Sequence, residues 1–227
     1  MKKLITLILG IAFVYSCSKN TDSNENTNTT LTDIDGNVYQ TVVICNQTWT
    51  KTNLNVSKYR NGNVIPQVTS SAQWAALTTG AWCYYSNDSS NGTTYGKIYN
   101  WYAVNDPRGL APVGYHIPSD TESSSLINCL GGANIAGGAI KEIGTGINHW
   151  TPPNLGATNS SGFSGLPAGF RYLDGTFTNI SQTGYWWTSS EFDTTTAWNR
   201  YFNYYSEGVF ANNSSKRNGF SVRCIKD

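Results

Sequence analysis

The stretch that decides the fold is Gly184-Tyr185-Trp186-Trp187-Thr188-Ser189-Ser190, late in the chain. Two adjacent Trp residues, the Tyr before them and the small hydroxyl residues after them form a poor helix and a good buried strand. The C-terminal stretch Asn218–Cys224 predicts a closing strand that could pair near it. We therefore expect aromatic strands from the end of the chain to lie side by side.

The composition indicates one turn-rich domain. The chain has 227 residues, of which 13% are charged and 13% aromatic, with 22 Gly. These values suit many β elements better than a helical bundle, and the aromatic side chains exclude disorder across the whole chain. The formal charge is +1, or about −1 once Lys2 and Lys3 are removed with the first sixteen residues. Because there is no basic excess, nucleic acid is a poor candidate partner.

The N-terminus predicts export and lipid anchoring. A short positive region precedes the apolar run Leu4–Tyr15, which is too short for a stable spanning helix and has the proportions of a signal peptide, residues 1–16. The run ends at Val14-Tyr15-Ser16-Cys17, which resembles a bacterial lipobox although Tyr15 departs from the small residue often found there. Cys17 would then carry the acyl chains that hold the protein on a membrane. The alternative is an ordinary cleaved signal with a chance Cys.

Residues 17–31 are predicted to form a flexible tether. Ser18–Thr30 contains no aromatic or large aliphatic residue, so nothing there can offset the entropy of ordering. The folded domain is expected over residues 32–227. We expect the protein to lie in the cell envelope, lipid-anchored to the outer membrane. One of the two possible orientations exposes it at the cell surface, and the sequence does not decide which membrane leaflet carries the anchor.

Helix signals come early in this domain and strand signals come late. Ser70 caps a predicted short helix over 70–77, and Ser119 and Glu122 have the capping-box spacing for a helix to about Leu130. Two more helices are expected, over 95–104 and 139–143. The predicted late strands lie at 169–172, 176–177, 185–187, 197–205, 208–210 and 220–225. The order predicts the α+β class.

Six ordered motifs carry a family resemblance. They are Trp49-Thr50-Lys51-Thr52-Asn53-Leu54, Tyr95-Gly96-Lys97-Ile98-Tyr99-Asn100-Trp101, Gly114-Tyr115-His116-Ile117-Pro118-Ser119, Gly162-Phe163-Ser164-Gly165-Leu166-Pro167, Trp186-Trp187-Thr188-Ser189-Ser190 and Ser221-Val222-Arg223-Cys224. Together they resemble the Fibrobacter succinogenes major paralogous domain, a family of secreted and lipid-anchored bacterial proteins. The resemblance implies a C-type-lectin-like or sulfatase-modifying-factor-like fold, with a twisted antiparallel sheet, two or more short helices and long loops.

The chain departs from this family at three positions. Ser123 stands where a Trp is expected, Ala111 where many relatives carry a Cys, and Cys45 where a Gly is usual. The disulfide pattern of the family therefore cannot be carried over. The candidates Cys45, Cys83, Cys129 and Cys224 allow up to two disulfides in three pairings, and the alternative is one or more free buried thiols.

No residue pattern in the chain identifies a catalytic or metal site. The only histidines are His116 and His149, and we expect His116 to be structural because no further metal ligands accompany it. The sequence around Ser164 lacks the nucleophile-elbow pattern. Paired carboxylates are conceivable among Glu122, Glu142, Glu191 and Glu207, although nothing in the sequence brings two together. The lectin-like resemblance raises calcium-dependent sugar binding, but in Trp198-Asn199-Arg200 a cation stands where the second carboxylate of such a site would be. Sugar binding of that kind is therefore disfavoured, and no metal site or cofactor is predicted.

The segment from Trp198 to Ser215 predicts a binding surface. It is rich in Tyr, Asn, Ser, Trp and Arg, which are typical of adaptable binding surfaces. The predicted ligand-binding residues are Tyr185, Trp198, Arg200, Tyr201, Tyr204, Asn212 and Asn213. An equally weighted alternative is a core hairpin with buried aromatics in alternation.

Three functions remain open from the sequence. The first is a lipid-anchored binding or adhesion module of the cell envelope that recognises a glycan or a surface protein. The second is a polysaccharide-processing enzyme with a carboxylate pair that the sequence does not place. The third is a structural envelope component without a small ligand.

Overall fold

The structure is a computed structural model, which describes residues 30–146 and 149–227. The predicted signal peptide, Cys17 and most of the predicted tether lie outside these residues. Strand β1 (Thr30–Thr32) already pairs with β2 (Val38–Ile44), and Leu31 is buried. The last two residues of the predicted tether, Thr30 and Leu31, therefore belong to the folded domain, which begins earlier than position 32.

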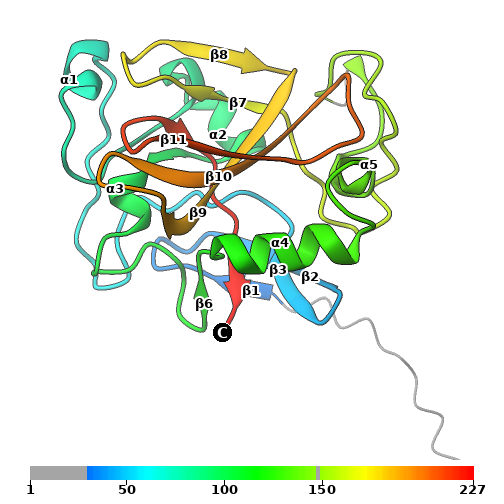
Figure 1. Cartoon of the computed structure of the whole chain (residues 1–227). Helices are drawn as coiled ribbons and strands as arrows, with labels where there is room; N and C mark the ends of the chain where they lie inside the picture. The colour runs from blue at the N-terminus through cyan, green and yellow to red at the C-terminus, as the bar shows by residue number, and fades with distance from the viewer. Residues whose placement is uncertain (1–29, 147–148) are drawn as a thin grey trace, which may run out of the picture.

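The smaller sheet lies at the base of the domain as drawn in Figure 1 and has the strand order β1-β2-β3-β13-β6. Its three remaining strands are β3 (Gln47–Thr50), β6 (Tyr115–His116) and β13 (Ile225–Lys226). The last strand of the chain thus pairs between two early strands, β3 and β6, in antiparallel register. Pairing of the C-terminal strand β13 with β3 therefore holds the end of the chain against its early part.

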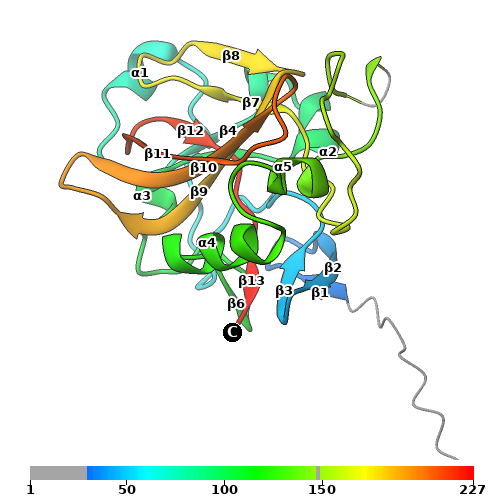
Figure 2. The same cartoon turned by 45° about the vertical axis from the view of Figure 1, so that its right-hand side comes forward.

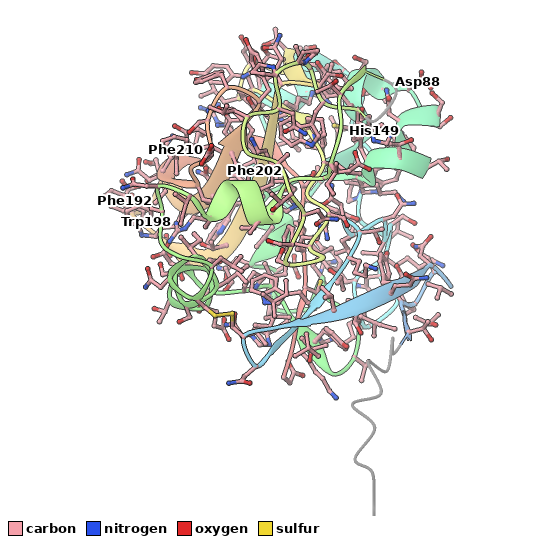
Figure 3. The ribbon with its side chains drawn as sticks, turned by 90° about the vertical axis from the view of Figure 1, so that its right-hand side faces the viewer. Asp88, His149, Phe192, Trp198, Phe202 and Phe210 are labelled. Carbon is pink, nitrogen blue, oxygen red and sulfur yellow. A yellow bond between two sulfur atoms is a disulfide. The ribbon has the colours of Figure 1, made fainter. Side chains whose placement is uncertain are left out.

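A disulfide joins this sheet to helix α4 (Asp120–Cys129). The β2–β3 turn holds Cys45 at φ 52° and Asn46 at φ 69°, a left-handed conformation that favours Gly. Cys45 nevertheless occupies the turn, and its sulfur bonds to Cys129 at the end of α4 (Figure 3). Of the four candidates, Cys83 and Cys224 remain free and buried. Of the up to two disulfides expected, the described part of the chain contains one, and the alternative of free buried thiols describes Cys83 and Cys224. Burial raises the pKa of both free thiols to about 12.

The larger sheet has the order β11-β10-β9-β7-β12-β5-β4, and β8 pairs with β7. Its strands are β4 (Trp82–Cys83), β5 (Ile98–Asn100), β7 (Ala168–Arg171), β8 (Phe177–Ile180), β9 (Thr183–Glu191), β10 (Thr196–Asn203), β11 (Phe210–Ser215) and β12 (Gly219–Phe220). All its pairs are antiparallel except β7 with β9. Ser221 bonds to the backbones of Tyr185 and Trp187, so the closing segment does lie beside the deciding stretch.

The helices are short, and half of the six described begin where a side chain caps them. They are α1 (Ser71–Ala75), the 3-10 turn η1 (Tyr85–Asn87), α2 (Ser90–Tyr95), α3 (Trp101–Val104), α4 and α5 (Ala136–Ile140). Ser70 caps α1, and Ser119 and Glu122 form the predicted capping box of α4. Two helix predictions were wrong. The segment 95–104 was expected to be one helix, but it contains strand β5 followed by α3, because Asn100 accepts a hydrogen bond from the amide of Ala103 and starts the helix at Trp101. The helix expected over 139–143 is α5, which begins three residues earlier, at Ala136.

The deciding stretch joins the two largest cores. Trp186 packs with Trp49, Phe163 and Phe202 in a core shared by both sheets and α4, which lies between the sheets in Figure 2. Trp187 points to the other face of β9 and packs in a separate core. This alternation is expected for successive residues of a strand.

The mixture of short helices and mainly antiparallel strands confirms the predicted α+β class. The strands form two sheets, where the resemblance implied one.

Three buried cations bind loops together. Arg171 donates to three backbone carbonyls, Arg223 donates to three carbonyls and to Asn53, and Lys141 donates to the carbonyls of Leu155, Asn203 and Ser206. None of these cations forms an ion pair with a described residue. Since buried backbone carbonyls need donors, these side chains supply them where loops replace regular structure.

Candidate binding surface

Strands β9, β10 and β11 form a ribbon at one side of the larger sheet, and its residues divide between two faces. Arg200 lies opposite Trp186 in the register, and Tyr201 lies opposite Tyr185 and Phe210. Because side chains alternate along a strand, residues 198, 200 and 202 share one face and residues 199, 201 and 203 share the other. The predicted site residues are therefore split between opposite sides of the ribbon.

The first face is turned toward α4. Nη1 of Arg200 lies 2.6 Å from Oδ1 of Asp120, and its Nη2 donates to Ser124 Oγ at 2.9 Å. Only 9% of Arg200 is exposed. Its neighbour Phe202 stacks on Trp186 at 4.5 Å in the shared core. Arg200 therefore fastens the ribbon to α4, and its predicted contact with a ligand stays a prediction.

The second face carries the aromatic ladder, which we define as Phe170, Tyr185, Tyr201 and Phe210. The rings follow one another across β7, β9, β10 and β11 with centroids 4.7–5.1 Å apart. Three are partly buried, and Phe210 is 37% exposed on the edge strand β11. Five cavities are found elsewhere in the described part of the chain, and none of the five is lined by a ladder residue.

The ladder presents ring edges and hydroxyls more than ring faces. Tyr201 is stacked between Tyr185 and Phe210, and Tyr185 is stacked between Tyr201 and Phe220. Both faces of each tyrosine ring are therefore covered by neighbouring rings. Burial is the main cause that raises the pKa of both Tyr185 and Tyr201, so their hydroxyls remain protonated at neutral pH. Hydroxyls in this state both donate and accept hydrogen bonds.

Beside the ladder, Lys141 fixes the turn that follows β10. Its ammonium binds the carbonyls of Asn203 and Ser206, on either side of Tyr204 and Tyr205. Tyr204 is half-buried against the shared core, whereas Tyr205 is 63% exposed. Lys141 itself is fully buried, and burial lowers its pKa to about 8. The turn after β10 is therefore held by the Lys141 ammonium, which loses its proton at mildly alkaline pH.

The remaining predicted residues are divided in the same way. Trp198 and Asn213 are register partners on the face opposite the ladder, and the ring of Phe192 meets Trp198 edge-on at 5.0 Å. Figure 3 places Phe192 and Trp198 together at the margin of the molecule. Asn212 is exposed and pairs with Asn199 on the ladder side. The structure therefore brings Tyr185, Tyr201 and Asn212 to one face.

Sequence reasoning missed Phe170 and Phe210 in the ladder, and Phe192 beside Trp198. Phe210 lies in the segment that was singled out, and its alternation with Asn212 puts both on one face of a strand. Phe170 gave no comparable signal, because it joins the ladder only through the parallel pairing of β7 with β9.

His116 is held between two carboxylates. Its Nδ1 lies 2.8 Å from Asp227 and its Nε2 lies 2.9 Å from Glu122. Partial burial alone would lower the pKa of His116, but the bonds to Asp227 and Glu122 outweigh burial and raise it. Glu122 also accepts hydrogen bonds from the backbone and hydroxyl of Ser119. The cluster thus joins the capping box of α4 to the end of the chain.

The other candidate carboxylates are separated from one another. Glu142 bonds to His149 and Glu191 to Lys216. Among the described residues, no hydrogen bond or ion pair joins two of Glu122, Glu142, Glu191 and Glu207, and the same residues contain no group of His, Cys, Asp and Glu suited to a metal ion. The described residues therefore bring no two of these four carboxylates together, and two of the four, Glu122 and Glu142, each pair with a histidine.

The fold and this surface together define an α+β domain with a half-exposed aromatic face. The chain belongs to the family described as the Fibrobacter succinogenes major domain, whose model matches residues 42–226. Membership associates the chain with bacterial envelope proteins. No curated protein and no solved structure matches it.

Within residues 30–146 and 149–227, the structure contains no helix with the length and apolar character needed to cross a membrane.

Proposed function

We propose that the protein is a lipid-anchored, non-catalytic module of the bacterial envelope that binds a surface protein through the aromatic ladder. The observation that carries the proposal is a row of four aromatic rings, partly exposed on one face of the sheet and ending at its edge strand β11. Contiguous exposed apolar surface of this kind marks interaction sites. Tyrosines on rigid strands bind at low entropic cost, because they have few rotatable bonds.

The stacking of the rings favours a protein over a glycan. A sugar ring packs best on a free aromatic face, and within the ladder only Phe210, at the edge, has no second ring against it. The Tyr201 hydroxyl and the amide of Asn212 instead offer hydrogen bonds on the ladder side, as polar groups at protein interfaces do. A glycan is the alternative outcome of the test.

The edge of the ribbon adds backbone donors and acceptors. The amide of Tyr204 bonds toward β9, at Gln182, and the amide of Lys216 bonds toward β10, at Thr195. By alternation, Ala211 and Asn213 direct their backbone groups away from the sheet. A strand of a partner can therefore extend the sheet beside the ladder.

The test uses outer-membrane extract from cells that lack the protein, immobilised and probed with the full chain. We expect binding that is abolished by pretreating the extract with proteinase and unchanged by periodate oxidation of its glycans. Tyr201→Ala and Phe210→Ala should each weaken binding at least about tenfold. The matched control is Phe192→Ala, which removes an exposed ring from the opposite face. Binding lost only after periodate would assign a glycan, and equal loss in the control would exclude the ladder.

The lipid anchor is tested separately through Cys17. Cys17→Ser should move the protein from the membrane to the soluble fraction, and should remove the acyl mass from the N-terminal peptide. Retention of the acylated peptide in this variant would contradict the anchor.

A further inference from the structure

We infer that a groove at the far end of the ribbon binds a carboxylated sugar. The groove has a volume of about 300 Å³ and is lined by the polar side chains of Thr78, Tyr102, Thr194, Thr195, Ser215 and Arg217. It lies where the end of α1, helix α3 and the β9–β10 turn meet the end of β11, on the left in Figure 1. The ladder residue Phe210 is at the opposite end of β11, so this site is separate from the proposed protein-binding face.

Arg217 is the residue that points to an anionic ligand. Its Nη1 donates to the carbonyl of Ala75 at 2.6 Å, while Nε and Nη2 bond to no described residue. Each of the other five arginines makes at least two hydrogen bonds through its guanidinium group. The Nε and Nη2 edge is one of the two forks by which a guanidinium binds a carboxylate in bidentate geometry. Arg217 thus carries an open fork in a cavity.

The acidic groups nearest the groove in sequence are already engaged. Oδ1 of Asp193 accepts hydrogen bonds from the amides of Thr195 and Thr196 and from the Thr195 hydroxyl, and these bonds lower its pKa to about 2. Glu191 is paired with Lys216. Neither acid forms an ion pair with Arg217 within the described residues. The fork therefore has no internal carboxylate and can take one from a ligand.

The hydroxyls define the rest of the ligand. Thr78, Tyr102 and Thr194 line the groove, and their hydroxyls have no hydrogen bond to a described residue. Such hydroxyls can both donate and accept, which suits a ligand that carries several hydroxyls of its own. A carboxylate for the arginine and vicinal hydroxyls for the threonines are combined in a uronic acid or another acidic sugar. The volume is at the lower limit for ligand pockets and suits one such residue.

The experiment measures binding to the purified full chain by saturation-transfer NMR and calorimetry, with glucuronate, glucose and acetate as probes. We expect glucuronate to bind at least about tenfold more tightly than glucose, which lacks the charge, and than acetate, which lacks the hydroxyls. Arg217→Gln should abolish this preference, and Arg217→Lys should restore only part of it because an ammonium cannot form the fork.

Two further variants protect the test against a folding defect. Thr78→Val and Tyr102→Phe remove one hydroxyl each, leave the bond between Arg217 and Ala75 intact, and should weaken glucuronate binding several-fold. Arg108→Gln makes the same charge change outside the groove and should have no effect. Equal binding of glucuronate and glucose, acetate binding as tight as glucuronate, or unchanged affinity in Arg217→Gln would each overturn the inference. The Tyr201→Ala variant should bind glucuronate normally, which separates this site from the proposed protein-binding function.

Discussion

The two faces of strand β10 differ although their residues alternate along one short segment. The face with Arg200 and Phe202 is closed by α4, an ion pair and a stacked tryptophan. The face with Tyr201 is left half-open, and its ring is held by the rings on either side. The same composition of aromatic and polar residues thus supplies stability on one side and a surface on the other. The difference comes from what packs against each side, and residue type alone does not reveal it.

The most severe way to break the closed face is Phe202→Ala. Phe202 is buried and contacts both Trp186 and Trp150, so its removal leaves a cavity in the core shared by both sheets. We expect a loss of about 3–5 kcal/mol in the free energy of unfolding, measured by urea denaturation. Tyr201→Ala, one residue earlier, should cost about 1–2 kcal/mol because its ring is half-exposed. Equal costs at the two positions would contradict the assignment of the faces.

The second prediction concerns the ion pair on the closed face. Arg200→Met keeps much of the side-chain volume but leaves Asp120 without its partner, and we expect a loss of about 2–3 kcal/mol, moderated by the partial exposure of Asp120. A double-mutant cycle with Asp120→Asn should show that Arg200 and Asp120 stabilise the fold jointly, so that the double variant loses less stability than the sum of the two single variants. Binding at the ladder should be unaffected in the folded variant. A binding defect with unchanged stability would return Arg200 to the ligand surface.

Features of the fold that depend on neighbouring residues could be predicted from the sequence, whereas features that depend on contacts between distant residues could not. The strand at 184–190, the caps at Ser70 and Ser119 and the α+β class follow from local patterns, and the structure confirms them. Local patterns also suggested that Arg200 was exposed, since it follows Trp and Asn in a polar-aromatic run. Its partner Asp120 is eighty residues earlier, and no local pattern reports such a contact.

The same limit applies to the site and the disulfide. The ladder draws Phe170 and Phe210 from strands on either side of the predicted stretch, so it depends on strand order and register. Cys45 pairs with Cys129 because the β2–β3 turn meets the end of α4, and spacing alone left three pairings open. The departure of Cys45 from the usual Gly was nevertheless informative, because that position has the positive φ that favours Gly.

A third prediction uses pH to test the turn beside the open face. Lys141 has a pKa of about 8 in the folded protein because burial lowers it from its ordinary value of 10.5. Between these two values the folded state binds fewer protons than the unfolded state, so stability rises with pH. We expect a gain of up to about 2 kcal/mol between pH 8 and pH 10. Urea denaturation at the two pH values measures it, and Lys141→Met should remove the gain.

The control for that experiment is Lys58→Met, because the Lys58 side chain is 43% exposed and pairs with Asp35 at the surface. Its loss should leave the alkaline gain intact. If stability still rises between pH 8 and pH 10 in Lys141→Met, the rise comes from other titrating groups, and the prediction for Lys141 is wrong.

The smallest expected change in stability is at the edge of the open face. Phe210→Ala removes the last ring of the ladder, which is 37% exposed and stacks on Tyr201 alone among the ladder rings. We expect a loss of about 1 kcal/mol or less, measured by urea denaturation, because little buried surface is exposed. The same change uncovers one face of the Tyr201 ring, so a sugar could then stack where none did before. Stability that falls as much as in Phe202→Ala would show that the ladder is part of the core, and the open face would then lose its claim to be a binding surface.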